Sequence, residues 1–323
     1  MKPRLSHHGT RRARKHRGAY RMCLWIAPWA AGLLAALSSN APSAQRPVSG
    51  PIEFEEIAAQ SGINFSIDSS PTPNKNQIEA TVAGVALIDH DNDVYQDIFF
   101  ANGAAIPSLK KEGPQYKNRL YHNNGDGTFT DVTTETGIAQ HLGRGMGVAI
   151  ADYDGDGFMD IFVANDDSPN FLFHNIGGKR FEEVAVPSWV AYNPSGKTTS
   201  AMGADFRDLN NDGRPHIWFT ALPTEMFPLF LNRGAGAFDD ATRTSGLAWA
   251  TQGMAGWSNA IVDLDNDGWK DLFAVERSCF VKPLRLSRFT RLLCDLIECP
   301  AGWTLGAQPR RDRHRERKQE DNA

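Results

Sequence analysis

Residues 152–160 read Asp-Tyr-Asp-Gly-Asp-Gly-Phe-Met-Asp, and apolar residues precede and follow them. The same acidic pattern starts again, without gaps, at Asp89, Asp208 and Asp263. The four starts lie 63, 56 and 55 residues apart. A repeat with a period of about 50 residues indicates an architecture built from copies of one structural unit.

Two further sequence marks recur with the acidic segment and keep one order. The first is a Phe followed by polar, mostly acidic residues, at Phe54, Phe129, Phe181 and Phe238. The second is Leu-Tyr-His-Asn or a close variant of it, at 120–123, 172–175 and 229–232. Three independent marks that keep one order and one period are typical of a true internal repeat.

Each repeat predicts four short strands. Runs rich in β-branched and aromatic residues, such as 147–150 and 161–163, flank the acidic segment, and the other two marks supply the third and fourth strands. Small residues at the start of each unit suit the innermost strand of a blade, because several chains crowd round the axis of a propeller there. The sequence therefore predicts an all-β β-propeller of four-stranded blades with Asp-rich loops, of which about three and a half blades are present in an incomplete ring.

The acidic loops place side-chain oxygens at positions 1, 3, 5 and 9, and three of the four have Gly at position 6. Calcium takes about six to eight oxygen ligands, and this spacing predicts a structural Ca²⁺ site in each loop. The alternative is that Asp, Asn and Gly only form hairpin turns. The predicted metal ligands are Asp89, Asp91, Asp93, Asp97, Asp152, Asp154, Asp156, Asp160, Asp208, Asn210, Asp212, Asp263, Asp265, Asp267 and Asp271.

The four loops are unequal. The loops that start at Asp152 and Asp263 are complete, whereas the first loop has Val94 at the Gly position. The third loop has Asn210 at position 3 and His216 in place of the last carboxylate. We therefore expect the third loop to bind calcium most weakly or not at all.

The 323 residues are 41% hydrophobic and 22% charged, which is the composition of a globular protein. The formal charge of −4 conceals a charge of −16 on residues 45–275, so this part should repel nucleic acid and anionic lipid. Residues 1–44 contain no acid, and a basic segment precedes an apolar run and small residues. This order predicts a signal peptide and an extracytoplasmic location, with an uncleaved anchor or a nucleic-acid-binding arm as alternatives.

The repeat pattern resembles the FG-GAP and VCBS-type propeller repeats of integrin α-subunits and bacterial secreted proteins. The Leu-Tyr-His-Asn mark is similar to that of the bacterial cartilage-acidic-protein-like family, which is associated with an ASPIC/UnbV domain. The resemblance covers about residues 54–275. It implies a seven-bladed, calcium-binding propeller displayed outside the cytoplasm, which acts in adhesion or recognition of protein or glycan ligands.

The sequence departs from that family in two ways. Fewer blades are present, and the pattern stops after Val275, where a basic tail without repeat marks, 276–323, begins. This predicts a truncated or frame-disrupted family member, and a native disordered tail is the alternative. Open blade edges would favour self-association. A decayed product without function is a third hypothesis.

No metalloprotease, phosphate-loop or dinucleotide motif occurs in residues 45–275, so we expect no enzyme activity. Gly256-Trp-Ser258 resembles part of a nucleophile elbow, but it falls on a predicted first strand. His122 and His174 occupy equivalent repeat positions, which indicates a structural role. The alternative function is a polysaccharide lyase or hydrolase, in which aromatic residues such as Trp189, Trp249 and Trp257 would line a sugar-binding face.

Overall fold

The computed structural model describes residues 53–68, 73, 83–103, 113–276, 284–286 and 290–296. The chain divides into two units, Met1–Phe54 and Glu55–Ala323. The predicted signal peptide, and most of the predicted tail after residue 276, lie outside the described residues. In the part of the chain that is described, none of the helices combines the length and the apolarity that crossing a bilayer requires.

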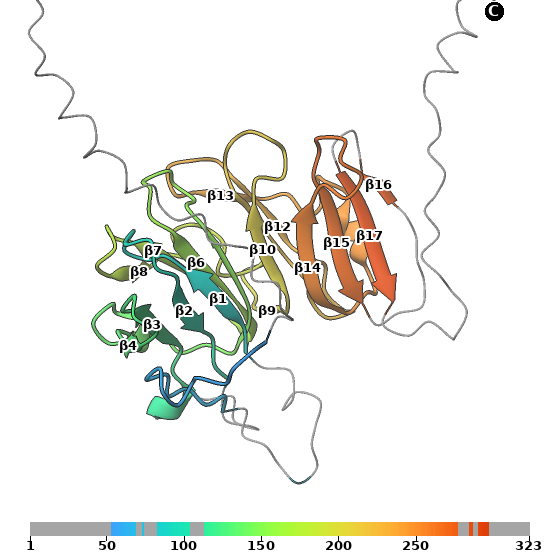
Figure 1. Ribbon diagram of the computed structural model, residues 1–323. Coiled ribbons are helices and arrows are strands. Elements are labelled where there is room, and N and C mark those ends of the chain that lie inside the picture. Colours follow the sequence, from blue (N-terminus) through green and yellow to red (C-terminus); the bar gives the residue numbers. More distant parts are fainter. Residues whose placement is uncertain are drawn as a thin grey trace, which may run out of the picture. The chain divides into compact units, whose positions relative to one another are not determined.

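Three sheets have the same plan, in which four consecutive strands pair in chain order and antiparallel (Figure 1). The first contains β1 (Val85–Ile88), β2 (Asp97–Phe100), β3 (Arg119–Asn123) and β4 (Phe129–Asp131). The second contains β5 (Gly145–Ala151), β6 (Asp160–Ser168), β7 (Phe171–Asn175) and β8 (Phe181–Glu183), and β9 (Thr199–Ser200) also pairs with β6. The third contains β10 (Ala204–Arg207), β11 (His216–Phe219), β12 (Leu229–Asn232) and β13 (Phe238–Asp240).

The fourth sheet follows this plan only in its first half. It contains β14 (Gly256–Val262), β15 (Asp271–Glu276), β16 (Leu284–Leu286) and β17 (Thr290–Leu296). β14 and β15 pair antiparallel around an acidic loop, but β15 then pairs in parallel with β17. The sequence after Val275 has no third-strand mark, and the strand order changes at that point. Three complete units and one half unit confirm the predicted all-β architecture.

Within the described residues, helical structure occurs in short connections. The 3₁₀ turn η2 (Pro114–Tyr116) lies between β2 and β3, and η3 (Ile138–Gln140) lies between β4 and β5. The helix α1 (Leu247–Thr251) follows β13. η3 and α1 each begin directly after a Gly in the left-handed conformation, Gly137 and Gly246. These connections are equivalent in the repeat, and both lead the chain to the first strand of the next sheet.

The first strands of consecutive sheets contact one another: β1 contacts β5, β5 contacts β10, and β10 contacts β14. A Cβ atom on Gly147 would lie 2.7 Å from the backbone nitrogen of Ala204, and one on Gly203 would lie 2.6 Å from Cα of Ser258. These distances are too short for any side chain. The small residues of the first strands are therefore required by the close approach of neighbouring backbones, as the sequence predicted.

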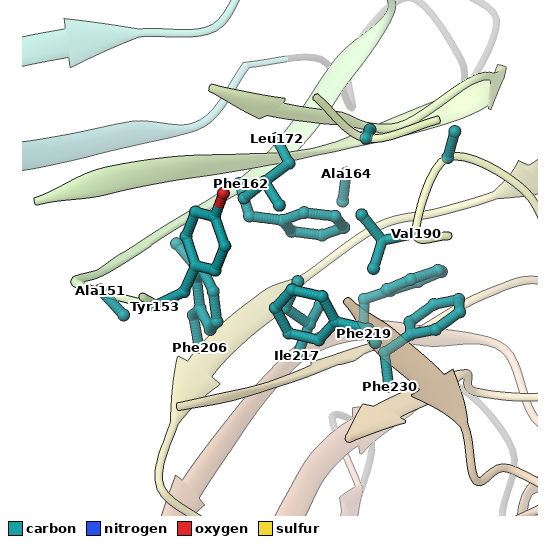
Figure 2. Packing of buried hydrophobic residues seen from close by; sticks show 14 of the residues in the cluster. Ala151, Tyr153, Phe162, Ala164, Leu172, Val190, Phe206, Ile217, Phe219 and Phe230 are labelled. Carbon is teal, nitrogen blue, oxygen red and sulfur yellow. The ribbon is translucent and has the colours of Figure 1, made fainter. Parts of the chain in front are cut away.

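Aromatic and aliphatic side chains fill the space between consecutive sheets. In Figure 2, Phe162 of the second sheet faces Phe206, Phe219 and Phe230 of the third. The rings of Phe162 and Phe219 are stacked, with centroids 5.8 Å apart. Similar clusters join the first sheet to the second and the third to the fourth. Because each fully buried Phe contributes about 1.5–3 kcal/mol, this packing holds the sheets together and fixes the loops at their ends.

Candidate metal centres

Each of the four acidic loops joins the first strand of a sheet to the second, between β1 and β2, β5 and β6, β10 and β11, and β14 and β15. The paired strands hold the two ends of each loop together. Val262 pairs with Asp271, for example, and Ala151 pairs with Asp160. The structure therefore brings the two ends of each acidic loop together, as a single metal site within the loop would require.

The first carboxylate of each loop organises the backbone around itself. Oδ1 of Asp89 accepts the N–H of Asp93 at 3.1 Å, and its Oδ2 accepts the N–H of Val94 at 3.0 Å. The corresponding bonds in the other loops run from Gly157 to Asp152 (3.0 Å), from Gly213 to Asp208 (2.8 Å) and from Gly268 to Asp263 (2.8 Å). In every loop the carboxylate at position 1 thus accepts the N–H of position 6, and the loop curves around that carboxylate.

The last carboxylate of the loop is buried and links three elements. Asp160 is fully buried, and its Oδ2 accepts the N–H of Tyr153 at 3.0 Å while its Oδ1 accepts the N–H of Asn175 on β7 at 2.8 Å. Asp97 accepts the equivalent N–H groups of His90 and Asn123 at 3.0 and 2.8 Å. The sequence assigned position 9 to metal binding alone, and it did not reveal this connection to the third strand.

The remaining carboxylates converge on the loop interior. Ligand atoms of Asp89, Asp91 and Asp93 lie within 4.8 Å of one another, as do those of Asp152, Asp154 and Asp160. Oδ1 of Asp91 is buried and has no hydrogen-bond partner among the residues described. Like charges this close destabilise one another, and an unpaired buried oxygen costs free energy. Both features fit a bound cation with oxygen ligands.

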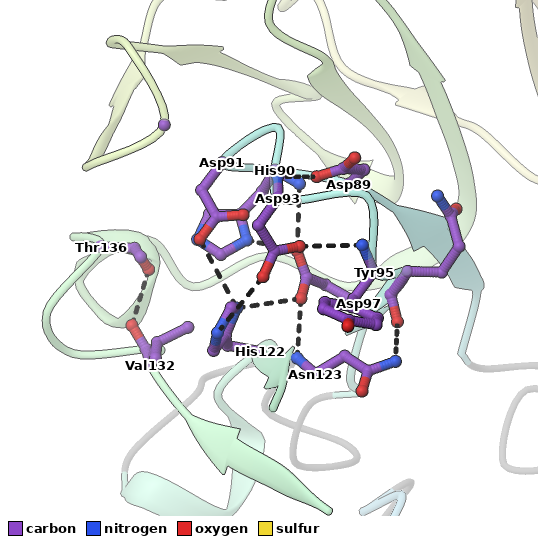
Figure 3. Close-up of polar contacts among 12 residues, drawn as sticks. Asp89, His90, Asp91, Asp93, Tyr95, Asp97, His122, Asn123, Val132 and Thr136 are labelled. Carbon is purple, nitrogen blue, oxygen red and sulfur yellow. Dashed lines mark hydrogen bonds and ion pairs between the residues drawn. The ribbon is translucent and has the colours of Figure 1, made fainter. Parts of the chain in front are cut away.

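Histidines from the third strands approach these loops. Nδ1 of His122 lies 3.2 Å from Asp97 Oδ1, and Nδ1 of His174 lies 3.1 Å from Asp160 Oδ1. In the first loop His90 also bonds to Asp97 (Figure 3). The sequence identified His122 and His174 as repeat features, and the structure shows that each contacts the last carboxylate of its loop.

Burial and hydrogen bonding act in opposite directions on these groups. Burial alone favours the neutral form of His90, but the hydrogen bond to Asp97 and the surrounding carboxylates raise the pKa of His90 above its usual value. Burial likewise opposes ionisation of Asp97, but the hydrogen bonds from His90 and Asn123 lower its pKa. At Asp160 burial prevails and raises the pKa to about 6.

The third loop has a different last residue and a different interior. His216 is buried, with 1% exposure, and its Nδ1 accepts the N–H of Asn232 at 3.1 Å, the role that a carboxylate has in the second loop. Burial lowers the pKa of His216, and because Nδ1 accepts the N–H of Asn232, the neutral ring carries its proton on Nε2. That nitrogen lies 3.9 Å from Asp212 Oδ1. This loop therefore presents a proton donor where the complete loops present a carboxylate.

Comparison with known proteins agrees with this architecture. The family model described as "FG-GAP-like repeat" matches residues 89–163 and 152–219. Cartilage acidic protein 1 of Xenopus tropicalis is 28% identical over 282 residues, and the human protein is 25% identical over 284. These alignments cover 83% and 84% of this chain but only 38% of each relative.

Among solved structures, an Agrocybe aegerita lectin that recognises non-reducing terminal N-acetylglucosamine aligns with a TM-score of 0.37 and 20% identity, covering 59% of this chain and 46% of the lectin. A likeness at that level supports no conclusion about this chain. The family match and the cartilage acidic protein alignments, by contrast, fall on the repeats and loops described above. Residues 89–219 therefore match the FG-GAP-like repeat, and the chain as a whole is similar to cartilage acidic protein 1 over 83% of its length.

Proposed function

We propose that this protein is secreted and acts as an adhesion or recognition module for protein or glycan ligands, with structural calcium in its acidic loops. The basic and apolar order of residues 1–44 supports export. Similarity to cartilage acidic protein 1, together with the FG-GAP-like repeats, supports a recognition role rather than a catalytic one. Strand edges left open by an incomplete ring would offer a route to self-association.

The observation that carries the calcium proposal is the convergence of carboxylates around a preformed turn. In the second loop Asp152, Asp154 and Asp160 approach one another, and Asp152 is already fixed by the N–H groups of Gly155 and Gly157. The ligand atoms that Asp152, Asp154 and Asp160 bring together are carboxylate oxygens, which suit a hard cation such as Ca²⁺. A bound cation would neutralise these carboxylates, and the carboxylates would hold it in the loop.

Calcium in this role stabilises the fold. In millimolar extracellular calcium, a site with a dissociation constant of about 10 µM would add about 2.7 kcal/mol to the free energy of unfolding. Two or three such sites would equal a large part of the ~5–15 kcal/mol that stabilises an ordinary domain. Ligand recognition would then occur on the surfaces that the stabilised sheets present.

The exposed serine that suggested a nucleophile elbow does not have that geometry. Ser258 lies within the strand β14 and pairs with Val275, whereas a nucleophile elbow is a sharp turn between a strand and a helix. A catalytic role for this residue therefore has no support from its position.

Thermal unfolding of the full chain, followed by circular dichroism, tests the calcium proposal. We expect the melting temperature to rise in 2 mM calcium relative to excess chelator, and to rise much less in equal magnesium. A variant with Asp152, Asp154 and Asp156 changed to Asn should lose part of the calcium effect. A melting temperature that is identical in chelator and calcium would refute structural calcium.

A further inference from the structure

The turn after the fourth strand recurs in the repeat and has one exceptional residue. In these turns the N–H of Thr136 bonds to the carbonyl of Val132, that of Ser188 to Val184, and that of Ser245 to Ala241, at 3.0, 2.9 and 2.8 Å. The next residue has a positive φ in each turn: Gly137 (85°), Trp189 (66°) and Gly246 (89°). The equivalent turn near the start of the described chain uses Gly62, with φ 81°. A tryptophan thus occupies a position where three sister turns have glycine.

Trp189 gains no burial in return for this conformation. A bulky residue with positive φ is an outlier because its Cβ crowds the backbone, and such strain clusters at functional sites. The Trp189 side chain is 75% exposed. Packing therefore does not explain why this turn has Trp instead of Gly, and the exposed ring points to a role at the protein surface.

Trp189 borders a cleft with a volume of about 830 Å³. Phe230 and Phe238 contribute its buried apolar floor, and Trp189 and Tyr192 its exposed aromatic sides. This volume falls in the range of about 300–1,000 Å³ that is usual for small-molecule sites. The cleft therefore combines a suitable size with aromatic faces that are open to solvent.

Polar groups on the same cleft make hydrogen bonds within the protein. Asp239 accepts a hydrogen bond from Nε of Arg233 at 2.8 Å, so its charge is already balanced. Asp240 lies deeper, and its Oδ1 accepts the N–H of Thr242 at 2.9 Å. Oδ1 of Asn193 accepts N–H groups of its own turn, which makes the Nδ2 amide the group that Asn193 offers to a ligand. The cleft presents both acceptors and donors beside its aromatic faces.

We propose that this cleft binds a neutral glycan, with the apolar face of a pyranose ring stacked on Trp189. The sugar hydroxyls would bond to Asp239 and to the amide of Asn193. A pyranose has an apolar C–H face bordered by hydroxyls, and aromatic rings beside precisely placed polar groups match that pattern. Arg233 already pairs with Asp239, so that carboxylate needs no charged group from the ligand. The proposal rests on the recognition function above and names its ligand class.

Binding of neutral tetrasaccharides built from glucose, galactose, mannose or N-acetylglucosamine tests the proposal. The full chain, in calcium, is titrated by calorimetry and tryptophan fluorescence. We expect at least one tetrasaccharide to bind and to change the indole emission. The Trp189→Gly variant should bind at least about tenfold more weakly, because it lacks the stacking surface. It should also melt at the same temperature as the original chain or higher, since glycine suits a positive φ.

Trp249→Ala is the matched control, because Trp249 is 83% exposed but lies on α1 and does not line the cleft. This variant should bind the sugar unchanged. Failure of every tetrasaccharide to bind, or undiminished binding by Trp189→Gly, would overturn the proposal. So would Trp189-dependent binding of a trilysine peptide in the absence of sugar binding, since that result would identify a cation site.

The same samples separate this proposal from the calcium proposal. Melting curves in chelator and in calcium report on the loops, and the titrations report on the cleft. A calcium-dependent melt without glycan binding would reject the cleft proposal alone. Trp189-dependent glycan binding by a chain whose melt ignores calcium would reject structural calcium and support the cleft proposal.

Discussion

The side-chain amide of Asn232 donates a 2.7 Å hydrogen bond to the backbone carbonyl of Tyr153, and this bond joins β12 of the third sheet to the acidic loop of the second. The same relationship links Asn175 on β7 to the carbonyl of His90 in the first loop, also at 2.7 Å. Oδ1 of Asn232 meanwhile accepts the N–H of Gly234. One buried amide therefore holds both its own hairpin turn and the loop of the preceding sheet.

Replacing Asn232 with Ala should lower the free energy of unfolding by about 1–3 kcal/mol, because the buried carbonyl of Tyr153 loses its side-chain donor. Denaturant unfolding of the full chain in calcium measures this change. Asn124→Ala is the control: Asn124 is an exposed amide in the turn after β3, and its loss should cost less than about 0.5 kcal/mol. Equal effects of the two substitutions would contradict the bridging role.

The period and the strand pattern made most of the fold predictable. The run 147–150 lies within β5, and 161–163 lies within β6, because β-branched residues between turn formers have few alternatives to a short strand. The crowding of first strands at Gly147 was also predictable, since only small residues allow backbones to approach so closely. These features are local, and a repeat displays them several times.

Features that depend on contacts between distant residues were not predictable. The sequence marks His216 as a lost carboxylate, but only the position of Asn232 shows that the ring replaces it as a hydrogen-bond acceptor. The parallel pairing of β15 with β17 likewise has no local signature. Trp189 was noticed as an aromatic residue, yet its strain appears only when its φ is compared with that of Gly137 and Gly246.

Replacing Val94 with Gly should stabilise the protein by about 1 kcal/mol. Val94 has φ 75° at the loop position where Gly157, Gly213 and Gly268 have φ of 92°, 82° and 90°. Its side chain is 81% exposed, so little packing is lost while the strain of a β-branched residue at positive φ is relieved. Denaturant unfolding in chelator measures the change without a calcium contribution.

Val85→Gly serves as the comparison for that substitution. Val85 is 60% exposed but lies in β1, where glycine weakens a strand. It should destabilise the protein, whereas Val94→Gly should stabilise it. If both substitutions destabilised the protein equally, strain at Val94 would be ruled out.

Replacing His216 with Asp should add a calcium site to the third loop. The buried imidazole presents a proton donor toward Asp212, and a carboxylate there would instead complete the oxygen set with Asp208. We expect one more calcium ion per chain by calorimetric titration, and a larger rise of the melting temperature with calcium. In chelator the variant should melt lower than the original chain, because a buried carboxylate lacks its counter-ion. An unchanged stoichiometry would mean that His216 does not limit this loop.

Without calcium, Asp160 should make the protein less stable as the pH rises from about 4 to about 7. Burial raises the pKa of Asp160 to about 6, above its ordinary value of 3.8. The folded chain therefore holds this proton more tightly than the unfolded chain, so the stabilisation is complete below about pH 4 and is lost as the pH passes 6. The difference of about two units between the pKa values of Asp160 in the folded and unfolded chains corresponds to about 3 kcal/mol of unfolding free energy.

Unfolding free energies of the original chain and of Asp160→Asn are measured in chelator from pH 4 to pH 7. The difference between the two proteins isolates the contribution of Asp160 from those of Asp97 and His90. It should fall by about 2.4 kcal/mol across that range. Saturating calcium should reverse the slope, because the cation binds the ionised carboxylate and competes with the proton. A difference that stays flat in chelator would show that Asp160 is ionised throughout the range. A fall that persists in calcium would show that the cation does not reach the carboxylate of Asp160.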